Sequence, residues 1–378
     1  MGSADKSVEV IVIGMGGMGS ATTYHLAKRG VDVLGLERFD VPHSKGSSHG
    51  STRVIRKAYH EDPSYVSLLH RAYELWERLE AESGNDLLYR CGSVSAGPPD
   101  DELVTGAVDA CEEHSLPYET LTGEELAERY PGFELPSGYR AVYQPDGGFL
   151  RAERSLVSHV ERAHASGAEI RAREGVEEWH STTDGVRVTT EKGTYTADRL
   201  VVTAGAWTGD LVEPIADSLS PERQVLGWFQ PERPERYSVE AFPAFGVSDG
   251  QHLHYGTPVF DVPGVKVGRH HHLEERVDPD RMDREPTARD ERILREFAER
   301  FLPDGAGPTM GLKTCIYTNS PDQQFVIDRL PSHPEVVVSG GFSGHGYKFA
   351  SVVGEITADL ASEGHTAHDI DLFSLDRL

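Results

Sequence analysis

Residues 8–19 read Val8-Glu9-Val10-Ile11-Val12-Ile13-Gly14-Met15-Gly16-Gly17-Met18-Gly19, and this stretch decides the fold. An apolar, β-branched run enters a G-x-G-x-x-G turn, and residues 20–29 continue at helical spacing until Gly30 stops them. A second apolar run, residues 31–37, ends in the carboxylate of Glu37. A strand, a glycine-rich turn, a helix and a second strand ending in an acid together predict a Rossmann-like site for a dinucleotide.

The residues of this motif have separate physical roles. Gly14, Gly16 and Gly19 let the backbone approach a pyrophosphate, whose charge lies at the N-terminus of the following helix. Glu37 can accept hydrogen bonds from a ribose diol, and Arg38 follows it at the same strand end. We expect all five residues to bind the cofactor. The alternative is a glycine-rich turn that binds nothing.

Composition narrows the class of protein. A chain of 378 residues can bury a large core and is long enough for two or more domains. Its net charge of −25 argues against nucleic acid and anionic membranes as partners. The acidic excess fits either an ordinary soluble enzyme or one adapted to high salt. No apolar stretch is long enough to cross a bilayer, and residues 1–6 are polar, so we expect a cytoplasmic protein without a signal peptide.

The three cysteines, Cys91, Cys111 and Cys315, show no C-x-x-C spacing. An odd and sparse set of this kind predicts neither a disulfide framework nor a zinc site.

Parallel-type strands recur near the start, middle and end of the chain. Apolar runs at 199–205 and 335–341 predict buried strands, residues 168–173 predict a further strand, and residues 186–196 predict a hairpin. Helical spacing recurs at 64–82, 155–165 and 351–361. We therefore expect a mixed α/β fold. Its nucleotide-binding domain is assembled from residues 1–85, 148–218 and 321–378, and residues 86–147 and 219–320 form an inserted domain with an antiparallel sheet.

Two basic residues stand close together just after the nucleotide-binding segment. Arg53 and Arg56 are three residues apart, and on a helical turn they would share one face. Such a pair could clamp a small carboxylate or steady a flavin ring. The alternative is a surface pair bridged to acids.

A histidine run at 270–272 invites a metal interpretation, but neighbouring residues of a strand point to opposite faces and do not converge on one ion. We therefore expect no metal site. In such a strand Lys266 and His270 share a face. The glycine-rich turn at 340–348 carries His345 and Lys348, and its amides can approach a flat ligand.

In their order along the chain, these segments resemble the monomeric sarcosine oxidase family of flavoproteins, which includes N-methyltryptophan oxidase and pipecolate oxidase. The most specific segment is Lys313-Thr314-Cys315-Ile316-Tyr317-Thr318. The resemblance implies that the dinucleotide is FAD and that Cys315 carries it through a thioether to the flavin 8α-methyl carbon. A buried structural thiol is the alternative. The segments that carry the similarity are 14–19, 50–56, 203–207, 223–229, 266–268, 313–318 and 341–348.

The resemblance also implies roles for the charged residues. Arg56 and Lys348 would hold the substrate carboxylate, and Arg53 would lie near the isoalloxazine ring, where positive charge favours the reduced anionic flavin. Lys266 would lie on the opposite flavin face and lower the energy of superoxide formed during reaction with O2.

Further residues are implied to surround the substrate amine and the flavin. Tyr255, His270 and Tyr317 would line the amine pocket. His345 would lie in the loop that carries Gly344. His49 would lie in the flavin-proximal loop, without a defined role.

The implied reaction is the oxidation of a secondary amino acid such as sarcosine to its imine, with O2 reduced to H2O2 by a monomeric enzyme. Departures from the family pattern, namely the basic run 269–272 and the bulky Trp228, Phe229 and Phe245, could favour a larger N-methyl or cyclic amino acid. Three alternatives stay open: a nicotinamide-dependent dehydrogenase, a flavin-binding accessory subunit without turnover, and an amine dehydrogenase that uses another acceptor.

Overall fold

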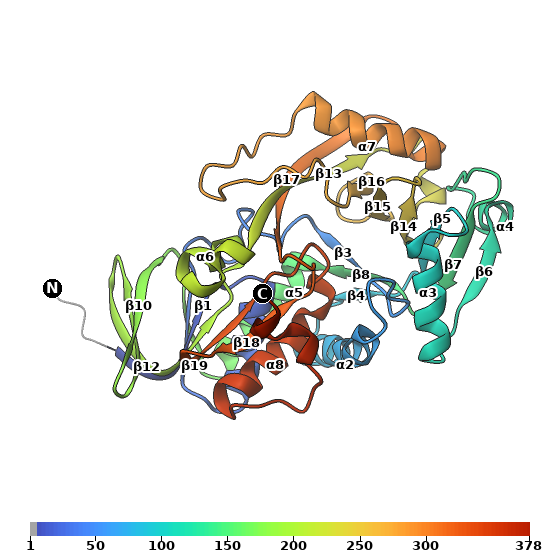
Figure 1. Ribbon diagram of the computed structural model, residues 1–378. Helices are drawn as coiled ribbons and strands as arrows, with labels where there is room; N and C mark the ends of the chain where they lie inside the picture. Colours follow the sequence, from blue (N-terminus) through green and yellow to red (C-terminus); the bar gives the residue numbers. More distant parts are fainter. Residues whose placement is uncertain (1–5) are drawn as a thin grey trace.

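β1 (Lys6–Ile13) is a central strand of the first sheet in the computed structural model, which describes residues 6–378 (Figure 1). It pairs in parallel with β2 (Val33–Leu36) on one side and with β12 (Gly193–Val202) on the other. β9 (Glu169–Arg171) extends the parallel sheet beyond β2, and β19 (His333–Gly340) extends it beyond β12. The predicted mixed α/β fold with a Rossmann-like sheet is confirmed. Residues 1–5, on which the cytoplasmic expectation partly rests, lie outside the described part.

Four helices pack together beside this sheet: α1 (Gly17–Lys28), α2 (Tyr65–Ser83), α5 (Ala152–Ala165) and α8 (Ala350–Ser362). α1 contacts both α5 and α8, so nearly all of its residues are buried. A Cβ added at Gly354 would lie 2.4 Å from the Cβ of Ala21, so glycine lets α8 approach α1 closely. This packing fixes the N-terminus of α1, where the glycine-rich turn ends.

The prediction that residues 194–196 and 199–205 belong to separate strands was wrong. They form the single strand β12, because β1 pairs along most of its length. The first half of β12 also pairs with β11 (Gly185–Thr190), and the second half pairs with β19. Two further antiparallel strands, β10 (Val176–Thr182) and β18 (Val326–Leu330), complete the sheet.

The second sheet has eight strands and lies apart from the first in Figure 1. All pairs are antiparallel except β14 with β5, and all strands fall within residues 93–144 and 220–319. We therefore propose that segments 86–147 and 219–320 form the inserted domain. The strand order is β17 (Thr309–Asn319), β13 (Ser220–Phe229), β16 (Val265–Arg269), β15 (Leu253–Thr257), β14 (Ala244–Ser248), β5 (Ser93–Gly97), β7 (Arg140–Gln144) and β6 (Glu119–Thr122).

Helices also pack on this second sheet. α7 (Ala288–Phe301) contacts β13 and β16, and α3 (Glu102–Glu113) contacts β5, β7 and β14. The remaining short helices are α4 (Gly123–Arg129), α6 (Thr208–Leu211), η1 (Gly205–Trp207), η2 (Glu213–Ser218), η3 (Pro234–Arg236), η4 (Pro303–Gly305), η5 (Tyr347–Phe349), η6 (Asp371–Phe373) and η7 (Leu375–Arg377).

A small sheet of β3 (Thr52–Ile55), β8 (Gly148–Arg151) and β4 (Leu88–Tyr89) lies against β15 of the second sheet. Arg53 lies in β3, so the prediction of a helical turn there was wrong. Residues 52–55 form a strand because they pair with the buried strand β8, which is distant in the sequence. Since β3 ends at Ile55 and the chain then bends, Arg53 and Arg56 are not placed by helical periodicity.

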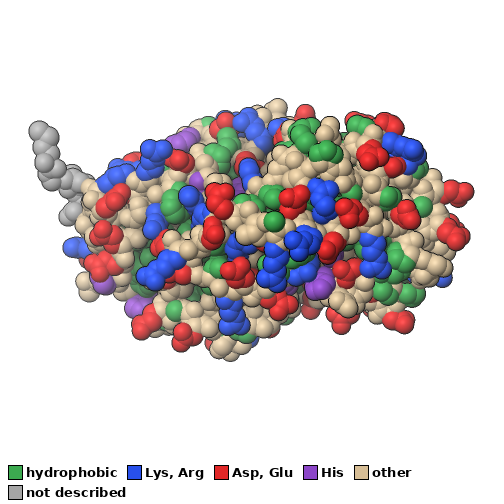
Figure 2. Space-filling view, turned by 90° about the horizontal axis from the view of Figure 1, so that it is seen from above, with side chains coloured by type: hydrophobic (Ala, Val, Ile, Leu, Met, Phe, Trp, Pro, Cys, Tyr) green, Lys and Arg blue, Asp and Glu red, His purple; other side chains and the backbone are tan. Residues whose placement is uncertain are grey.

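Acidic side chains are spread over the whole face shown in Figure 2 and form no single tract. Among the described residues, no helix is both long enough and apolar enough to span a bilayer.

Candidate active site

A cavity of about 360 Å³ runs from the glycine-rich turn to the second sheet. Three residues predicted for the site, Gly19, His49 and Lys266, do not line it. The predicted residues that do line it are Gly14, Gly16, Glu37, Arg38, Arg53, Arg56, Tyr255, His270, Cys315, Tyr317, Gly344, His345 and Lys348. The structure therefore brings most of the candidates into one cleft, although they come from widely separated segments.

The glycine-rich turn forms one end of the cleft. Gly14 has a φ of +89°, in the left-handed region that favours glycine. A Cβ at Gly19 would lie 1.8 Å from the carbonyl oxygen of Gly14, so Gly19 supports the turn without reaching the cavity. Gly16 lines the cleft just before α1 begins. The turn can therefore hold a diphosphate close to the helix N-terminus.

Glu37 follows β2 and faces the same end of the cleft. Its carboxylate accepts hydrogen bonds from the backbone amides of Met15 at 2.8 Å and Phe39 at 2.9 Å. Burial alone would raise the pKa of Glu37, but His43 and these amides lower it, so the group is anionic at neutral pH. Arg38 also lines the cleft and donates to Asp280 at 2.8 Å.

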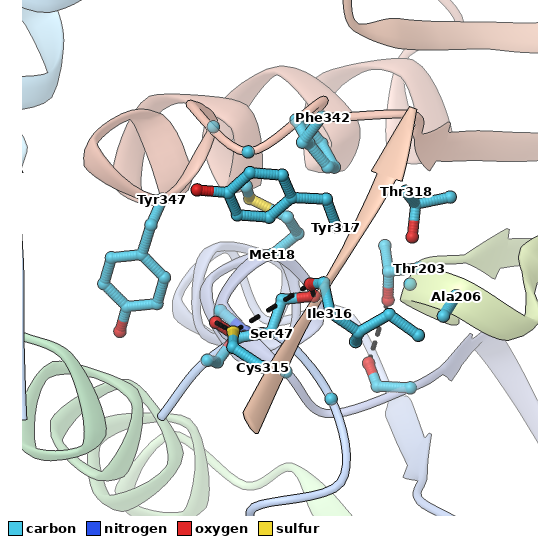
Figure 3. Close-up of a pocket in the computed structure, with 18 of the residues that line it drawn as sticks. Met18, Ser47, Thr203, Ala206, Cys315, Ile316, Tyr317, Thr318, Phe342 and Tyr347 are labelled. Atoms are coloured by element: carbon cyan, nitrogen blue, oxygen red, sulfur yellow. Dashed lines mark hydrogen bonds between the residues drawn. The ribbon is translucent and has the colours of Figure 1, made fainter. Parts of the chain in front are cut away.

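Cys315 lies on β17 in the middle of the cleft and is 3% exposed. Its Sγ is 3.9 Å from the carbonyl oxygen of Ser47 (Figure 3). The same Sγ is 3.9 Å from Nη2 of Arg53. The Arg53 guanidinium is held there by the carbonyls of Ser47 at 2.6 Å and Thr52 at 2.8 Å. A fixed positive charge beside the sulfur would stabilise negative charge that develops on it or on a ring bound there.

The cations Arg56 and Lys348 line the same cleft and lie near the buried ring of Tyr59. The Arg56 Cζ is 5.4 Å and the Lys348 Nζ is 5.0 Å from the ring centroid. Arg56 Nη2 also donates to Glu61 at 3.1 Å. Burial and the charge of Arg56 lower the pKa of Lys348 to about 7, and Glu61 opposes this shift. Arg56 and Lys348 are two basic groups beside one acid, Glu61. The site can therefore bind the carboxylate of a ligand as a second negative charge.

Glu61 was missed by the sequence analysis. It lines the cavity and is ion-paired with Arg56, yet no local pattern marks it. Ser48 supports the glycine-rich turn, since its Oγ accepts a 2.9 Å hydrogen bond from the amide of Gly17.

Three ring side chains line the cleft near this pair of cations. The hydroxyl groups of Tyr255 and Tyr317 are 3.2 Å apart, and the ring of His270 is 5.5 Å from that of Tyr317. Burial lowers the pKa of His270 well below its usual value and raises the pKa of Tyr317 well above its usual value. All three rings are therefore uncharged at neutral pH.

The prediction that Lys266 and His270 lie in one strand was wrong, because β16 ends at Arg269 and His271 has a φ of +56°. The three histidines consequently have different surroundings. His270 faces the cavity, His271 contacts Glu222 at 3.1 Å, and His272 contacts Asp290 at 2.9 Å. Within residues 6–378, no group of three or more His, Cys, Asp or Glu side chains is arranged to hold a metal ion.

Lys266 and His49 lie behind the cavity wall. The Lys266 ammonium donates to the carbonyls of Gly50 at 2.8 Å and Thr52 at 2.6 Å, and burial lowers its pKa well below the usual value. His49 is 3% exposed, and neither ring nitrogen has a hydrogen-bond partner among residues 6–378. Burial, helped by Arg53, lowers the pKa of His49 to about 3, so its ring is neutral.

The loop at 341–346 lines the cleft beside β17 of the second sheet. Gly344 has a φ of +82°, and a Cβ there would lie 2.4 Å from the ring of Tyr317. His345 is fixed by Tyr59 and by the carbonyl of Gln323, and burial lowers its pKa to about 4. Glycine therefore lets this loop pack directly on the aromatic wall (Figure 3).

The fold and the cleft together define a flavin-dependent oxidoreductase, and comparison with known proteins places the chain within one family. Residues 9–360 match the DAO family, described as FAD dependent oxidoreductase, and the chain belongs to it. It is similar to monomeric sarcosine oxidase of Bacillus sp. (strain NS-129), with 41% identity over 98% of this chain and 96% of that protein. It is 36% identical to N-methyl-L-tryptophan oxidase of Yersinia pestis (strain Pestoides F), over 98% of this chain and 99% of that protein.

Among solved structures, it resembles NikD, an unusual amino acid oxidase essential for nikkomycin biosynthesis, with a TM-score of 0.87 and 29% identity. This match covers 98% of this chain and 97% of that one. The chain is thus an FAD-dependent oxidase of the sarcosine oxidase type. This result overturns the alternatives of a nicotinamide-dependent dehydrogenase and of an accessory subunit without turnover.

Proposed function

We propose that this enzyme oxidises a secondary amino acid, such as the N-methyl amino acid sarcosine, to its imine and passes the electrons to O2, forming H2O2. The observation that carries the proposal is the pair Arg56 and Lys348, which lines the same cleft as Cys315. A carboxylate held by this pair would leave its amine beside the uncharged rings of Tyr255, His270 and Tyr317.

The residues of the cleft fit FAD. Gly14 and Gly16 would hold the diphosphate, Glu37 and Arg38 would lie at the adenosine end, and Cys315 would carry the flavin as an 8α-thioether. FAD supplies the redox chemistry, since it accepts a hydride equivalent from the C–H bond next to the amine. Arg53 would stabilise the negative charge of the reduced ring, and His49, Gly344 and His345 would shape the surrounding walls.

The surroundings of the amine site favour an unprotonated substrate amine. Tyr255, His270 and Tyr317 carry no charge at neutral pH, and their burial makes an additional cation there costly. An amine must also lose its proton before its C–H bond can deliver a hydride equivalent. The cleft therefore binds the reactive form, and water then hydrolyses the released imine.

Replacing Arg56 with alanine is expected to raise the KM for the substrate by about 10- to 100-fold, because a charge-assisted hydrogen bond contributes about 1.5–3 kcal/mol. Steady-state kinetics by peroxide formation measures this change. Arg56→Lys is the matched control and should recover part of the loss. An unchanged KM in Arg56→Ala would mean that another group holds the carboxylate.

Binding of a carboxylate should weaken as the pH rises through about 7, where Lys348 loses its proton. The bound anion favours the charged ammonium, so binding takes up a proton above this pKa and the Kd rises by up to about tenfold per pH unit. Because acetate has no amine, its Kd, followed by flavin absorbance, isolates this effect. The groups facing Lys348 are Arg56, Glu61, Tyr59, His60 and His345.

The pH dependence should disappear in Lys348→Gln, which has no titrating ammonium. A Kd for acetate that stays constant in the native enzyme between about pH 6 and 9 would contradict the role of Lys348.

A peroxide assay across sarcosine, other N-methyl amino acids and cyclic secondary amino acids tests the proposed function. We expect H2O2 in proportion to substrate consumed, with an aldehyde released from N-methyl substrates. Turnover only of primary amino acids would contradict the proposal.

A further inference from the structure

The wall formed by the second sheet contains a recess that the proposed chemistry leaves unused. Residues Leu226, Gly268, Tyr255 and Gly246 lie directly opposite one another on the adjacent strands β13, β16, β15 and β14. Opposed residues of neighbouring strands project from the same face of a sheet. All four therefore face the cleft, and Leu226, Tyr255 and Gly246 line it.

Two of these four opposed residues, Gly268 and Gly246, are glycines, and a Cβ added at each would have different surroundings. A Cβ at Gly268 would lie 2.6 Å from the ring of Tyr255, so the ring lies over Gly268 and requires glycine there. The Tyr255 hydroxyl lies 3.2 Å from the hydroxyl of Tyr317 on β17. Tyr255 is therefore directed along the sheet towards β16 and β17, and it leaves the space above Gly246 free.

Gly246 has no comparable structural reason to be glycine. The atoms nearest to a Cβ there would belong to Leu253 at 3.5 Å and Leu103 at 3.7 Å, and both distances are ordinary van der Waals contacts. Its φ lies outside the left-handed region, and glycine within a strand is unfavourable for stability. The missing side chain instead leaves room between Leu103 of α3 and Leu253 of β15, both of which line the cavity.

The polar side chains Ser248 and Asp101, at one end of this recess, are hydrogen-bonded to each other. Ser248, on the same face of β14 as Gly246, donates to Asp101 at 2.5 Å. Asp101 also caps α3 by accepting from the amide of Leu103 at 3.0 Å. Apolar side chains thus face the space, which suits an apolar group.

The recess adjoins the site proposed for the carboxylate. A Cβ at Gly106 of α3 would lie 2.8 Å from the carbonyl oxygen of His60, so α3 packs on the segment that follows Arg56. Arg56 contacts the His60 ring at 2.7 Å. A substrate held by its carboxylate can therefore reach the recess with its side chain.

From this arrangement we infer that the preferred substrate is a secondary amino acid with an aliphatic side chain, which occupies the recess at Gly246. This inference rests on the proposed function and narrows its substrate class. Sarcosine has no side chain and leaves the recess unfilled. Because each added methylene buried in an apolar pocket changes kcat/KM by about 10- to 200-fold, the preference should be large.

The test compares kcat/KM for N-methyl-L-leucine and sarcosine in the holoenzyme. The native enzyme should favour N-methyl-L-leucine by at least about tenfold. Gly246→Leu fills the recess and should lower this ratio by at least about tenfold, and Gly246→Ala should lower it by less. If Gly246→Leu does not fold, Gly246→Ala decides the result.

Binding without turnover gives an independent readout. The Kd values of 4-methylpentanoate and acetate, followed by flavin absorbance, should show the same preference and the same loss in the variants. A native ratio at or below one, or a ratio unchanged by both substitutions, would overturn the inference while leaving the proposed function intact. No peroxide from either substrate would instead contradict the proposed function.

Discussion

Cys315→Ala is expected to abolish covalent attachment of the flavin completely. In the native protein, acid precipitation should leave the yellow chromophore with the polypeptide, and the denatured chain should carry the added mass of one FAD. In the variant, the flavin should remain in the supernatant and the chain should have its unmodified mass. The physical reason is that Cys315 alone of the three cysteines lines the cleft, beside Arg53.

Cys111→Ala is the matched control, because Cys111 is equally buried but lies in α3 and does not line the cleft. It should keep the flavin attached. Covalent flavin in Cys315→Ala would show that the tether is elsewhere.

Lys266→Met is expected to slow reoxidation of the reduced enzyme by O2 by about 100- to 1000-fold and to change flavin reduction by substrate far less. The scale is that of removing one preorganised charge that stabilises a developing anion. The side chain is held by the carbonyls of Gly50 and Thr52, next to the segment that carries Arg53. Stopped-flow measurement of the two half-reactions separates the effects.

Lys266→Arg is the conservative control and should retain part of the oxygen reactivity. Because Lys266 does not line the cavity, its proposed role requires its charge to act through the cavity wall or across a small rearrangement. Equal losses in both half-reactions would mean that Lys266 only supports the structure. If Lys266→Met kept the reactivity of the native enzyme with O2, a group other than Lys266 would be responsible for that reactivity.

The nucleotide-binding end of the molecule could be predicted because its determinants are local. The glycine spacing, the flanking apolar strands and Glu37 all lie within forty residues. Each of these features is visible in a short stretch of sequence, without knowledge of which distant segments pack against it. The strand, turn and helix were therefore predicted with nearly correct bounds.

Errors arose where distant strand pairing decides the local structure. β8 holds Arg53 in a strand although its spacing suited a helix, and β1 joins residues 193–202 into one strand. Glu61 and the recess at Gly246 have no local signal, since they depend on which helix and which strands become neighbours. Sequence similarity supplied the candidate residues, whereas the structure showed which of them share one cleft.

The most direct test of the account is anaerobic mixing of the purified yellow enzyme with a secondary amino acid, followed by admission of air. The account predicts that the absorbance of oxidised flavin is lost before air is admitted. It then returns in air once the substrate is consumed, with one H2O2 formed per molecule of substrate oxidised. Flavin that stays oxidised with sarcosine, N-methyl-L-leucine and every other secondary amino acid tested would contradict it.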